Sequence, residues 1–299
     1  MPGATPAAVS DGAISVGVLD LEVSMTRTIV ITGASDGIGA ASAKQLAQLG
    51  EEVVVVGRNP DKTARVARTL GVDSFVADFS DLSQVRELAA SLLEKYPRID
   101  VLANNAGGVF GERTLTADGY ETTFQVNHLA PFLLTNLLRE RLLASGASVI
   151  QTSSAAAKLF PRFDLDDLQG ERRYSSTAAY GNAKLANVLF TKELHRRFGD
   201  EGLSAVAFHP GVIASNFGSS SNGPWKFLYG GPLAQQLMTS TSVGGARLTW
   251  LALGKPGVDW QPGGFYANNK PAKTNRLADD PAVSKVLWER SAALVGLDD

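Results

Sequence analysis

The chain contains no cysteine, and this absence excludes several kinds of site. Its 299 residues can form no disulfide, no thiolate nucleophile and no Cys-ligated zinc or iron–sulfur centre. The three histidines, His128, His195 and His209, are scattered without the spacing of metal ligands, so we expect no metal site. The lack of cysteine fits a reducing compartment, and we expect a cytoplasmic protein.

A strong charge imbalance and a long apolar run are also absent. The formal net charge of -2 gives no reason to expect nucleic acid or an acidic membrane as a partner. No run of about 18 apolar residues occurs, so we expect no membrane-spanning helix. With 44% apolar residues the chain can bury an ample core, and we expect a single folded domain.

Lysine and arginine are missing from the first 26 residues, which therefore lack the basic start of a secretory signal. We predict a flexible N-terminal extension over residues 1–26 and one folded domain over residues 27–299. Because Met25 directly precedes the first predicted strand, the upstream residues are either a mobile tail or an artefact of the assigned start site.

Strand-like and helix-like segments alternate along the rest of the chain. Such alternation predicts βαβ units and an α/β fold, a single-domain Rossmann-type, doubly wound parallel sheet of about seven strands with helices on both faces. The predicted strands are 29–31, 53–56, 74–77, 100–103, 148–152, 204–208 and 265–267, and the predicted helices are 39–49, 82–95, 120–143, 177–198 and 241–253. Two stretches interrupt the pattern: a polar insertion over 158–177 and a loop rich in glycine, serine and aromatic residues over 216–240.

A glycine-rich turn lies between the first predicted strand and the first predicted helix. Gly33, Gly37 and Gly39 have the spacing G-x-x-x-G-x-G, with Ser35, Asp36 and Ile38 between them. Glycines allow a pyrophosphate to approach backbone N–H groups at the positive end of a helix dipole. In this strand–turn–helix context, the turn predicts a dinucleotide site.

The tip of the second predicted strand bears on the choice between NAD and NADP. It carries Arg58 and Asn59 and no carboxylate that could bind a ribose 2′-hydroxyl. Arginine makes charge-assisted contacts with a 2′-phosphate, so we expect NADP(H) to be preferred over NAD(H). The carboxylate of Asp36 in the turn does not favour such a phosphate, because both groups are negatively charged.

Tyr180 and Lys184 are four residues apart in a predicted helix and therefore project from one face. Free tyrosine has a pKa near 10, which a nearby lysine cation and an oxidised nicotinamide both lower. The pair could thus exchange a proton with a substrate oxygen, although this spacing also occurs by chance on helix surfaces.

Several further motifs accompany this pair in a fixed order: Asn104-Asn105-Ala106-Gly107, Asn127 in the stretch 124–136, Ser153-Ser154 and His209-Pro210-Gly211. With the glycine-rich turn, this set resembles the short-chain dehydrogenase/reductase family over essentially all of residues 27–299. It looks closest to the retinol-dehydrogenase-like and WW-domain-oxidoreductase-like branch.

The resemblance implies catalytic roles for Asn127, Ser154, Tyr180 and Lys184. Ser154 would hydrogen-bond the substrate oxygen, with Ser153 as the competing candidate, and Tyr180 would be the acid in reduction and the base in oxidation. Lys184 would bind the nicotinamide ribose and tune Tyr180, and Asn127 would hold a water in a proton relay.

The resemblance also implies cofactor contacts beyond the glycine-rich turn. The residues concerned are Asp78 and Phe79 near the adenine, Asn105, Ala106 and Gly107 along the adenosine, and Pro210, Gly211, Ile213 and Ser215 around the nicotinamide carboxamide. Ser215 stands where the family commonly has threonine.

The loop over 216–240 is our candidate for the substrate rim, with disorder or simple packing onto the domain as its alternatives. Its aromatic residues, including Phe217 and Trp225, suggest a substrate with apolar bulk that contacts them together with Ser154 and Tyr180. We expect a ketone, aldehyde or secondary alcohol on a hydrophobic scaffold, and retinoids or steroids only by family analogy.

Two other functions compete with that of an NADP(H)-dependent oxidoreductase. The chain could be a catalytically silent NADP-sensing regulator or scaffold of the same fold, which the intact Ser154, Tyr180 and Lys184 disfavour. Another Rossmann-like enzyme, such as a methyltransferase, would have no use for these three residues. We expect a homodimer or homotetramer through the helices 120–143 and 177–198, with a monomer as the alternative.

Overall fold

The computed structural model describes residues 26–159, 162–211 and 239–297. In this part of the chain, eight strands form one sheet in the order β3-β2-β1-β4-β5-β6-β7-β8. The strands are β1 (Thr28–Thr32), β2 (Glu52–Gly57), β3 (Asp73–Val76), β4 (Val101–Asn104), β5 (Ser148–Thr152), β6 (Ser204–His209), β7 (Phe265–Ala267) and β8 (Lys270–Pro271). The predicted extension lies almost wholly outside the described residues.

The first seven strands run parallel, as the alternation predicts, and the eighth is an unpredicted antiparallel addition. It follows β7 through a two-residue turn in which Asn268 and Asn269 have φ values of 53° and 58°. Asparagine tolerates this left-handed conformation, which two-residue hairpins require. The sheet order reverses between β1 and β4, and ligands of such folds bind at this reversal, beyond the carboxyl ends of the strands.

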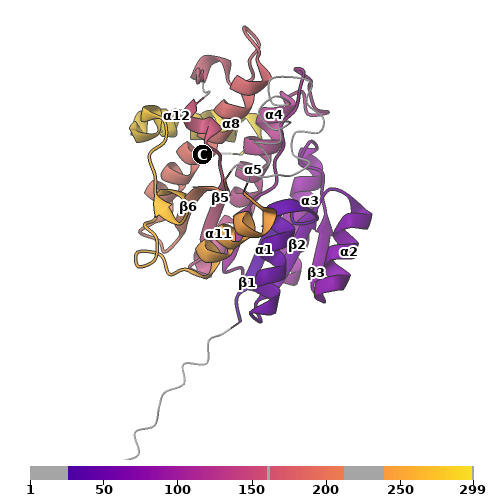
Figure 1. Ribbon diagram of the computed structural model, residues 1–299. Helices are drawn as coiled ribbons and strands as arrows, with labels where there is room; N and C mark the ends of the chain where they lie inside the picture. Colours follow the sequence, from indigo (N-terminus) through magenta and orange to yellow (C-terminus); the bar gives the residue numbers. More distant parts are fainter. Residues whose placement is uncertain (1–25, 160–161, 212–238, 298–299) are drawn as a thin grey trace, which may run out of the picture.

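Helices cover both faces of the sheet (Figure 1). The first face carries α1 (Gly37–Gln48), α2 (Pro60–Leu70) and α11 (Thr241–Leu253); the second carries α3 (Leu82–Lys95), α5 (Ala130–Leu137), α8 (Ser176–Phe198) and α12 (Pro281–Leu294). Alternate residues of β1 show why two layers form, because Val30 enters one core cluster whereas Ile29 and Ile31 enter the other. α2 and α12 were not among the predicted helices. No helix among the described residues has the length and apolar character to cross a membrane.

The predicted helix over 120–143 is helical from Thr122 to Ala144, but it is not a regular α-helix throughout. It is divided into α4 (Thr122–Phe124), the π-helical turn η1 (Gln125–Leu129), α5 and α6 (Arg139–Ala144). The side chain of Asn127 donates to the Thr123 carbonyl at 2.9 Å, which is the acceptor that an α-helix would give to the Asn127 N–H. Pro131 has no N–H, so the α-helical donor to the Asn127 carbonyl is also missing.

The short helix α7 (Ala156–Leu159) ends just inside the predicted polar insertion, which also contains the 3-10 turn η2 (Leu165–Asp167) before α8 begins at Ser176. Phe163, Leu165 and Leu168 from this segment pack against a cluster of buried residues to which α8 contributes. A second 3-10 turn, η4 (Arg276–Asp279), precedes α12. The insertion is therefore ordered against the domain where the structure describes it.

Candidate functional site

The expected site residues follow the carboxyl ends of β1 to β6. Because these strands are parallel, their ends meet along one edge of the sheet. The site is therefore assembled from segments that are far apart in the sequence.

The glycine-rich turn after β1 is tightly packed on one side and open on the other. A Cβ atom on Gly33, whose φ is +65°, would lie 2.8 Å from the Ala106 Cα, and one on Gly39 would lie 2.5 Å from the Gly33 carbonyl oxygen. Gly37, with a φ of +59°, has no atom within 4 Å of its Cβ position. Asp36 caps α1 by accepting from the Gly37 N–H at 2.8 Å, and the partly buried Ile38 follows in the first turn of the helix. The turn thus presents backbone at a helix N-terminus, as a phosphate site requires.

The segment after β4 is joined to this turn by hydrogen bonds. The Asn105 side chain donates to the carbonyls of Thr32 and Gly33 at 3.0 and 3.3 Å. The Thr32 hydroxyl accepts from the backbone N–H groups of Asn105 and Ala106, both at 3.0 Å. Asn105 and Ala106 are therefore brought against Gly33, next to the expected path of a dinucleotide.

The tip of β2 places Arg58 in solvent, where it has no hydrogen bond or ion pair with another described residue. Ser35 lies close by, because a Cβ atom on Gly57 would be 2.7 Å from the Ser35 Cβ. The Asn59 side chain is engaged as the cap of α2, accepting from the Lys62 N–H at 2.9 Å. Arg58 is thus an exposed cation beside the glycine-rich turn.

Lys62, which the sequence did not single out, pairs with the carboxylate of the turn. Its Nζ lies 3.0 Å from Asp36 Oδ2. This hydrogen bond, with that from the Gly37 N–H, lowers the pKa of Asp36. The carboxylate that the sequence places near the expected phosphate therefore has its own counter-ion.

Asp78 and Phe79, after β3, lie at the same edge in different environments. The Asp78 Oδ1 atom accepts from the Ser80 N–H and hydroxyl at 2.9 and 2.8 Å. Phe79 is buried in the core, and its carbonyl accepts from the Gln125 side chain at 3.3 Å. The ring of Phe79 is therefore a core residue, which leaves its backbone for the expected adenine contact.

Tyr180 and Lys184 are both buried, with exposed fractions of 6% and 2%. The Lys184 Nζ lies 5.6 Å from the centroid of the Tyr180 ring and donates to the Thr152 carbonyl at 3.1 Å. Burial lowers the pKa of the Lys184 amine to about 7. An amine with such a pKa both accepts and releases a proton near neutrality, as a relay requires.

Asn127 approaches Lys184 at Gly107. A Cβ atom on Gly107 would lie 2.5 Å from Asn127 Oδ1 and 3.1 Å from Lys184 Nζ. The Asn127 side chain is fully engaged: it donates to the Gly108 and Thr123 carbonyls, both at 2.9 Å, and accepts from the Gly108 N–H at 3.2 Å. A water held by Asn127 would therefore bind its main-chain carbonyl, which Pro131 deprives of an α-helical donor.

The two adjacent serines after β5 have different surroundings. The Ser153 hydroxyl is buried and donates to the Lys184 carbonyl at 2.7 Å, so it fixes α8 to the end of β5. Ser154 is partly exposed, and its hydroxyl oxygen accepts from the Ala156 N–H at 3.2 Å. Ala156 contacts Tyr180 in a small apolar cluster with Val109. This arrangement favours Ser154 over Ser153 as the hydroxyl that meets a substrate.

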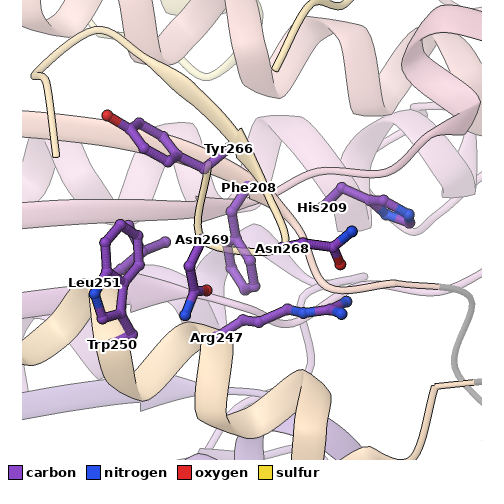
Figure 2. Close-up of a pocket in the computed structure, with 8 residues that line it drawn as sticks. All are labelled: Phe208, His209, Arg247, Trp250, Leu251, Tyr266, Asn268 and Asn269. Carbon is purple, nitrogen blue, oxygen red and sulfur yellow. The ribbon is translucent and has the colours of Figure 1, made fainter. Parts of the chain in front are cut away.

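The turn after β6 packs against α11 and the β7–β8 hairpin. Arg247 of α11 donates to the Pro210 carbonyl at 2.6 Å, and a Cβ atom on Gly211 would lie 2.5 Å from Arg247 Nη1. Figure 2 shows Arg247 extending from its helix toward the end of β6, where His209 also lies. Pro210 and Gly211 are described; Ile213, Ser215, Phe217, Trp225 and most of the loop 216–240 lie outside the described residues.

Three polar contacts at the site involve residues to which the sequence assigned no role. Two are those of Lys62 and Arg247, and in the third the His209 Nδ1 atom accepts from the Ala155 N–H at 3.3 Å. Only His209 had a usable signal, because it directly precedes Pro210 and Gly211. Lys62 and Arg247 lie in helices whose position relative to the site depends on the packing. Among the described residues, no group of three or more His, Asp or Glu side chains is placed to hold a metal ion.

The family model and the curated proteins that match this chain agree on one family. The family model for short chain dehydrogenase matches residues 27–224. A Streptomyces sp. (strain C5) protein assigned as a daunorubicin C-13 ketoreductase is 44% identical, over 90% of this chain and 93% of its own. Human retinol dehydrogenase 13 is 36% identical, over 91% and 85% of the two chains.

A solved structure agrees with these sequence relatives. An uncharacterized protein from Mycobacterium paratuberculosis is 34% identical, with a TM-score of 0.74 over 91% of this chain and 94% of its own. The residues that the family model matches include the glycine-rich turn and the Tyr180–Lys184 pair. The chain therefore belongs to the short-chain dehydrogenase/reductase family, in its retinol-dehydrogenase-like branch.

Proposed function

We propose that the protein is an NADP(H)-dependent oxidoreductase that interconverts a carbonyl and an alcohol on a hydrophobic small molecule. Membership of an oxidoreductase family with ketoreductase and retinol dehydrogenase relatives supports the reaction class. The observation that carries the proposal is the burial of Tyr180 beside the Lys184 amine, which the Thr152 carbonyl holds at the carboxyl edge of the sheet.

The residues of the turn fit a dinucleotide. Side chains at Gly33 and Gly39 would collide with neighbouring backbone, whereas the space at Gly37 is open at the start of α1. We propose contacts from Gly33 to Gly39, from Asn105 to Gly107, and from Asp78 and the backbone of Phe79. Pro210, Gly211, Ile213 and Ser215 are proposed to surround the nicotinamide, which supplies the hydride when bound.

In reduction, Tyr180 gives its hydroxyl proton to the substrate oxygen; in oxidation, it removes that proton. Ser154 donates a hydrogen bond to the same oxygen, where negative charge develops. Lys184 binds the ribose hydroxyls and passes protons to Tyr180, consistent with its pKa of about 7. The Asn127 carbonyl holds a water that links Lys184 to solvent.

Arg58 and Lys62 support a preference for NADP(H). Arg58 is exposed at the tip of β2, and Lys62 balances Asp36, so the cations are in excess where a 2′-phosphate would lie. Asn59 is proposed to contribute through its backbone, because its side chain caps α2.

The cofactor preference is tested by kcat/KM with NADPH and NADH for the wild type and Arg58→Ala. A hydrogen bond to a charged group contributes about 1.5–3 kcal/mol, so we expect Arg58→Ala to lose roughly 10- to 100-fold with NADPH and little with NADH. Arg68→Ala, an exposed arginine in the last turn of α2, is the matched control. An NADH preference in the wild type that Arg58→Ala leaves unchanged would contradict the proposal.

An apolar substrate fits the described residues around Tyr180. Val109 and Ala156 pack against it, and Leu159, on the short helix after Ser154, is 65% exposed. The names of the relatives point the same way, since daunorubicin and retinol both have extended apolar skeletons. We propose that Phe217 and Trp225 add to this surface.

Turnover is tested by NADPH consumption with daunorubicin, all-trans-retinal and a panel of hydrophobic ketones and aldehydes. We expect at least one to be reduced, and Tyr180→Phe to abolish turnover while NADPH still binds with wild-type affinity in a fluorescence titration. Complete silence across the panel with NADPH bound would instead favour an NADP-sensing regulator.

A cytoplasmic location and a homodimer or homotetramer complete the proposal. The absence of cysteine supports a reducing compartment. Fractionation of cells and light scattering coupled to size exclusion test the two statements.

A further inference from the structure

The chain leaves the sheet immediately after β5, and this departure forms the segment that carries Ser154. The ladder between β5 and β6 continues one bond beyond the strand, where the Ser153 N–H donates to the Phe208 carbonyl at 2.8 Å. Two residues later, the Ala155 N–H donates to Nδ1 of His209 at 3.3 Å. The His209 side chain thus takes the place of the backbone carbonyl that β6 would have supplied as acceptor if the ladder had continued.

Among the described residues, the other hydrogen bonds of the segment 154–157 are local, and its remaining contact with the domain is the packing of the buried Ala156 and Ala157. The Ser154 hydroxyl oxygen accepts from the Ala156 N–H at 3.2 Å, and the Ser154 carbonyl accepts from the Ala157 N–H at 3.1 Å. Both partners lie within three residues of Ser154, so they shape the turn but do not fix it to the sheet. The bond from Ala155 to His209 joins this turn to β6.

The His209 ring can act as acceptor only through an unprotonated Nδ1, which places its proton on Nε2. Burial, and secondarily the charge of Arg247, lower the pKa of His209 to about 4. The ring is therefore neutral at physiological pH. Arg247 also donates to the Pro210 carbonyl at 2.6 Å, so the residue after His209 is fixed to α11.

We propose that His209 is a positioning residue for Ser154: through the Ala155 N–H, its Nδ1 atom fixes the turn that aims the Ser154 hydroxyl at the substrate oxygen. The inference rests on the proposed role of Ser154. It gives the histidine before Pro210 and Gly211 a function in the geometry of the reaction, separate from cofactor binding.

Three substitutions separate this role from simple packing. In asparagine, the amide oxygen is bonded to Cγ, as Nδ1 is in histidine, so His209→Asn retains an acceptor at that position. His209→Leu removes the acceptor, and His209→Gln moves it one bond outward, to the place of Nε2. Asparagine is the smallest of the three, so loss of packing alone predicts that His209→Asn is the most damaging variant, whereas the proposal predicts that it is the least damaging.

The measurements are kcat and KM with the best ketone or aldehyde of the panel, NADPH affinity by fluorescence, and thermal unfolding. A misplacement of about 1 Å can cost up to about 100-fold in rate. We expect His209→Leu and His209→Gln to lose at least about tenfold in kcat, while KM and NADPH affinity change less than about twofold. His209→Asn should retain kcat within about threefold, so the acceptor rescues the reaction.

A double-variant cycle with Ser154→Ala tests whether the effect passes through Ser154. We expect His209→Leu to cause no further loss of kcat in the Ser154→Ala background. An equal loss in both backgrounds, an unchanged kcat in His209→Leu, or a loss in His209→Asn as large as in His209→Leu would overturn the proposal.

Nitrogen NMR of the imidazole rings gives a readout that does not depend on turnover, because the chain has only three histidines to assign. We expect His209 to be protonated on Nε2 alone at pH 7, and the Ala155 amide to exchange faster in His209→Leu than in His209→Asn. A proton on Nδ1, or equal exchange, would refute the contact itself. If these results hold but Ser154→Ala reduces substrate as fast as the wild type, the proposed role of Ser154 fails instead.

Discussion

Lys184→Met should stabilise the protein, and by an amount that depends on pH. Methionine matches the length of the lysine side chain but removes an amine that is 2% exposed and donates to a single described acceptor, the Thr152 carbonyl. Burial disfavours the charged amine and lowers its pKa from 10.5 to about 7. The wild type therefore bears a folding cost that the variant lacks.

The direction of the pH dependence follows from the protonation of Lys184 in the folded and unfolded states. Between pH 7 and 10.5 the unfolded chain keeps the Lys184 proton more readily than the folded protein does, so stability rises with pH across this window. Below about pH 7 the cost is complete, and one pKa unit corresponds to 1.36 kcal/mol, which gives about 5 kcal/mol. From pH 7 to pH 9 the difference between variant and wild type should shrink by about 2 kcal/mol, because the folded amine is already half deprotonated at pH 7. Relaxation around the amine reduces this figure, and we expect at least about 1 kcal/mol.

Urea denaturation of the wild type and Lys184→Met at pH 7 and pH 9 measures this double difference. Groups common to both proteins, including the three histidines, cancel in it. Lys192→Met is the matched control, because Lys192 lies on the same helix and pairs with Asp279 at the surface, 2.7 Å away. We expect its stability difference from the wild type to be the same at both pH values.

The same pH slope in Lys184→Met and the wild type would refute the reasoning. It would mean that the amine keeps its ordinary pKa, and hence that it reaches solvent or a further acceptor. The same conclusion would follow if Lys184→Met were less stable than the wild type at pH 7.

Four further substitutions test the rest of the site. Gly107→Ala would place a methyl group 2.5 Å from Asn127 Oδ1 and 3.1 Å from Lys184 Nζ, so we expect kcat to fall at least about tenfold, and an unchanged kcat would show that this junction is adaptable. Ser154→Ala should reduce kcat by about 100- to 1,000-fold at nearly constant stability. Ser153→Ala should instead retain most of kcat and lose about 1 kcal/mol of unfolding free energy, since the Ser153 hydroxyl donates to the Lys184 carbonyl. A large loss of kcat in Ser153→Ala and a small one in Ser154→Ala would mean that Ser153 is the residue that contacts the substrate. Lys62→Ala should weaken NADPH binding severalfold in a titration and leave NADH binding nearly unchanged, and an equal effect on both cofactors would remove Lys62 from the 2′-phosphate site.

The helix over 120–143 illustrates how sequence patterns can mislead about detail. Its apolar periodicity predicts one helix, and the structure has four segments with a π-helical turn at Asn127. The cause is local, since the Asn127 amide takes the Thr123 carbonyl and Pro131 lacks an N–H. Periodicity reports which residues face the core and does not register such competition for backbone groups.

The eighth strand and the ordered insertion show the same limit. β8 is two residues long and depends on the left-handed turn at Asn268 and Asn269, which gives no strand pattern. The sequence of the insertion is polar, yet Phe163, Leu165 and Leu168 pack against a buried core cluster. Short elements are stabilised by their tertiary contacts, which a single sequence does not display.

By itself, the sequence determined the alternation of strands and helices, the glycine-rich turn and the four-residue spacing of Tyr180 and Lys184, because these depend on neighbouring residues. Only the tertiary structure decided that Lys62 balances Asp36, that the Ser153 hydroxyl is occupied by the Lys184 carbonyl, and that His209 anchors Ala155. It also set the pKa of Lys184, which follows from burial. These properties belong to contacts between segments 26 to 54 residues apart, and parallel strands bring such segments together at one edge of the sheet.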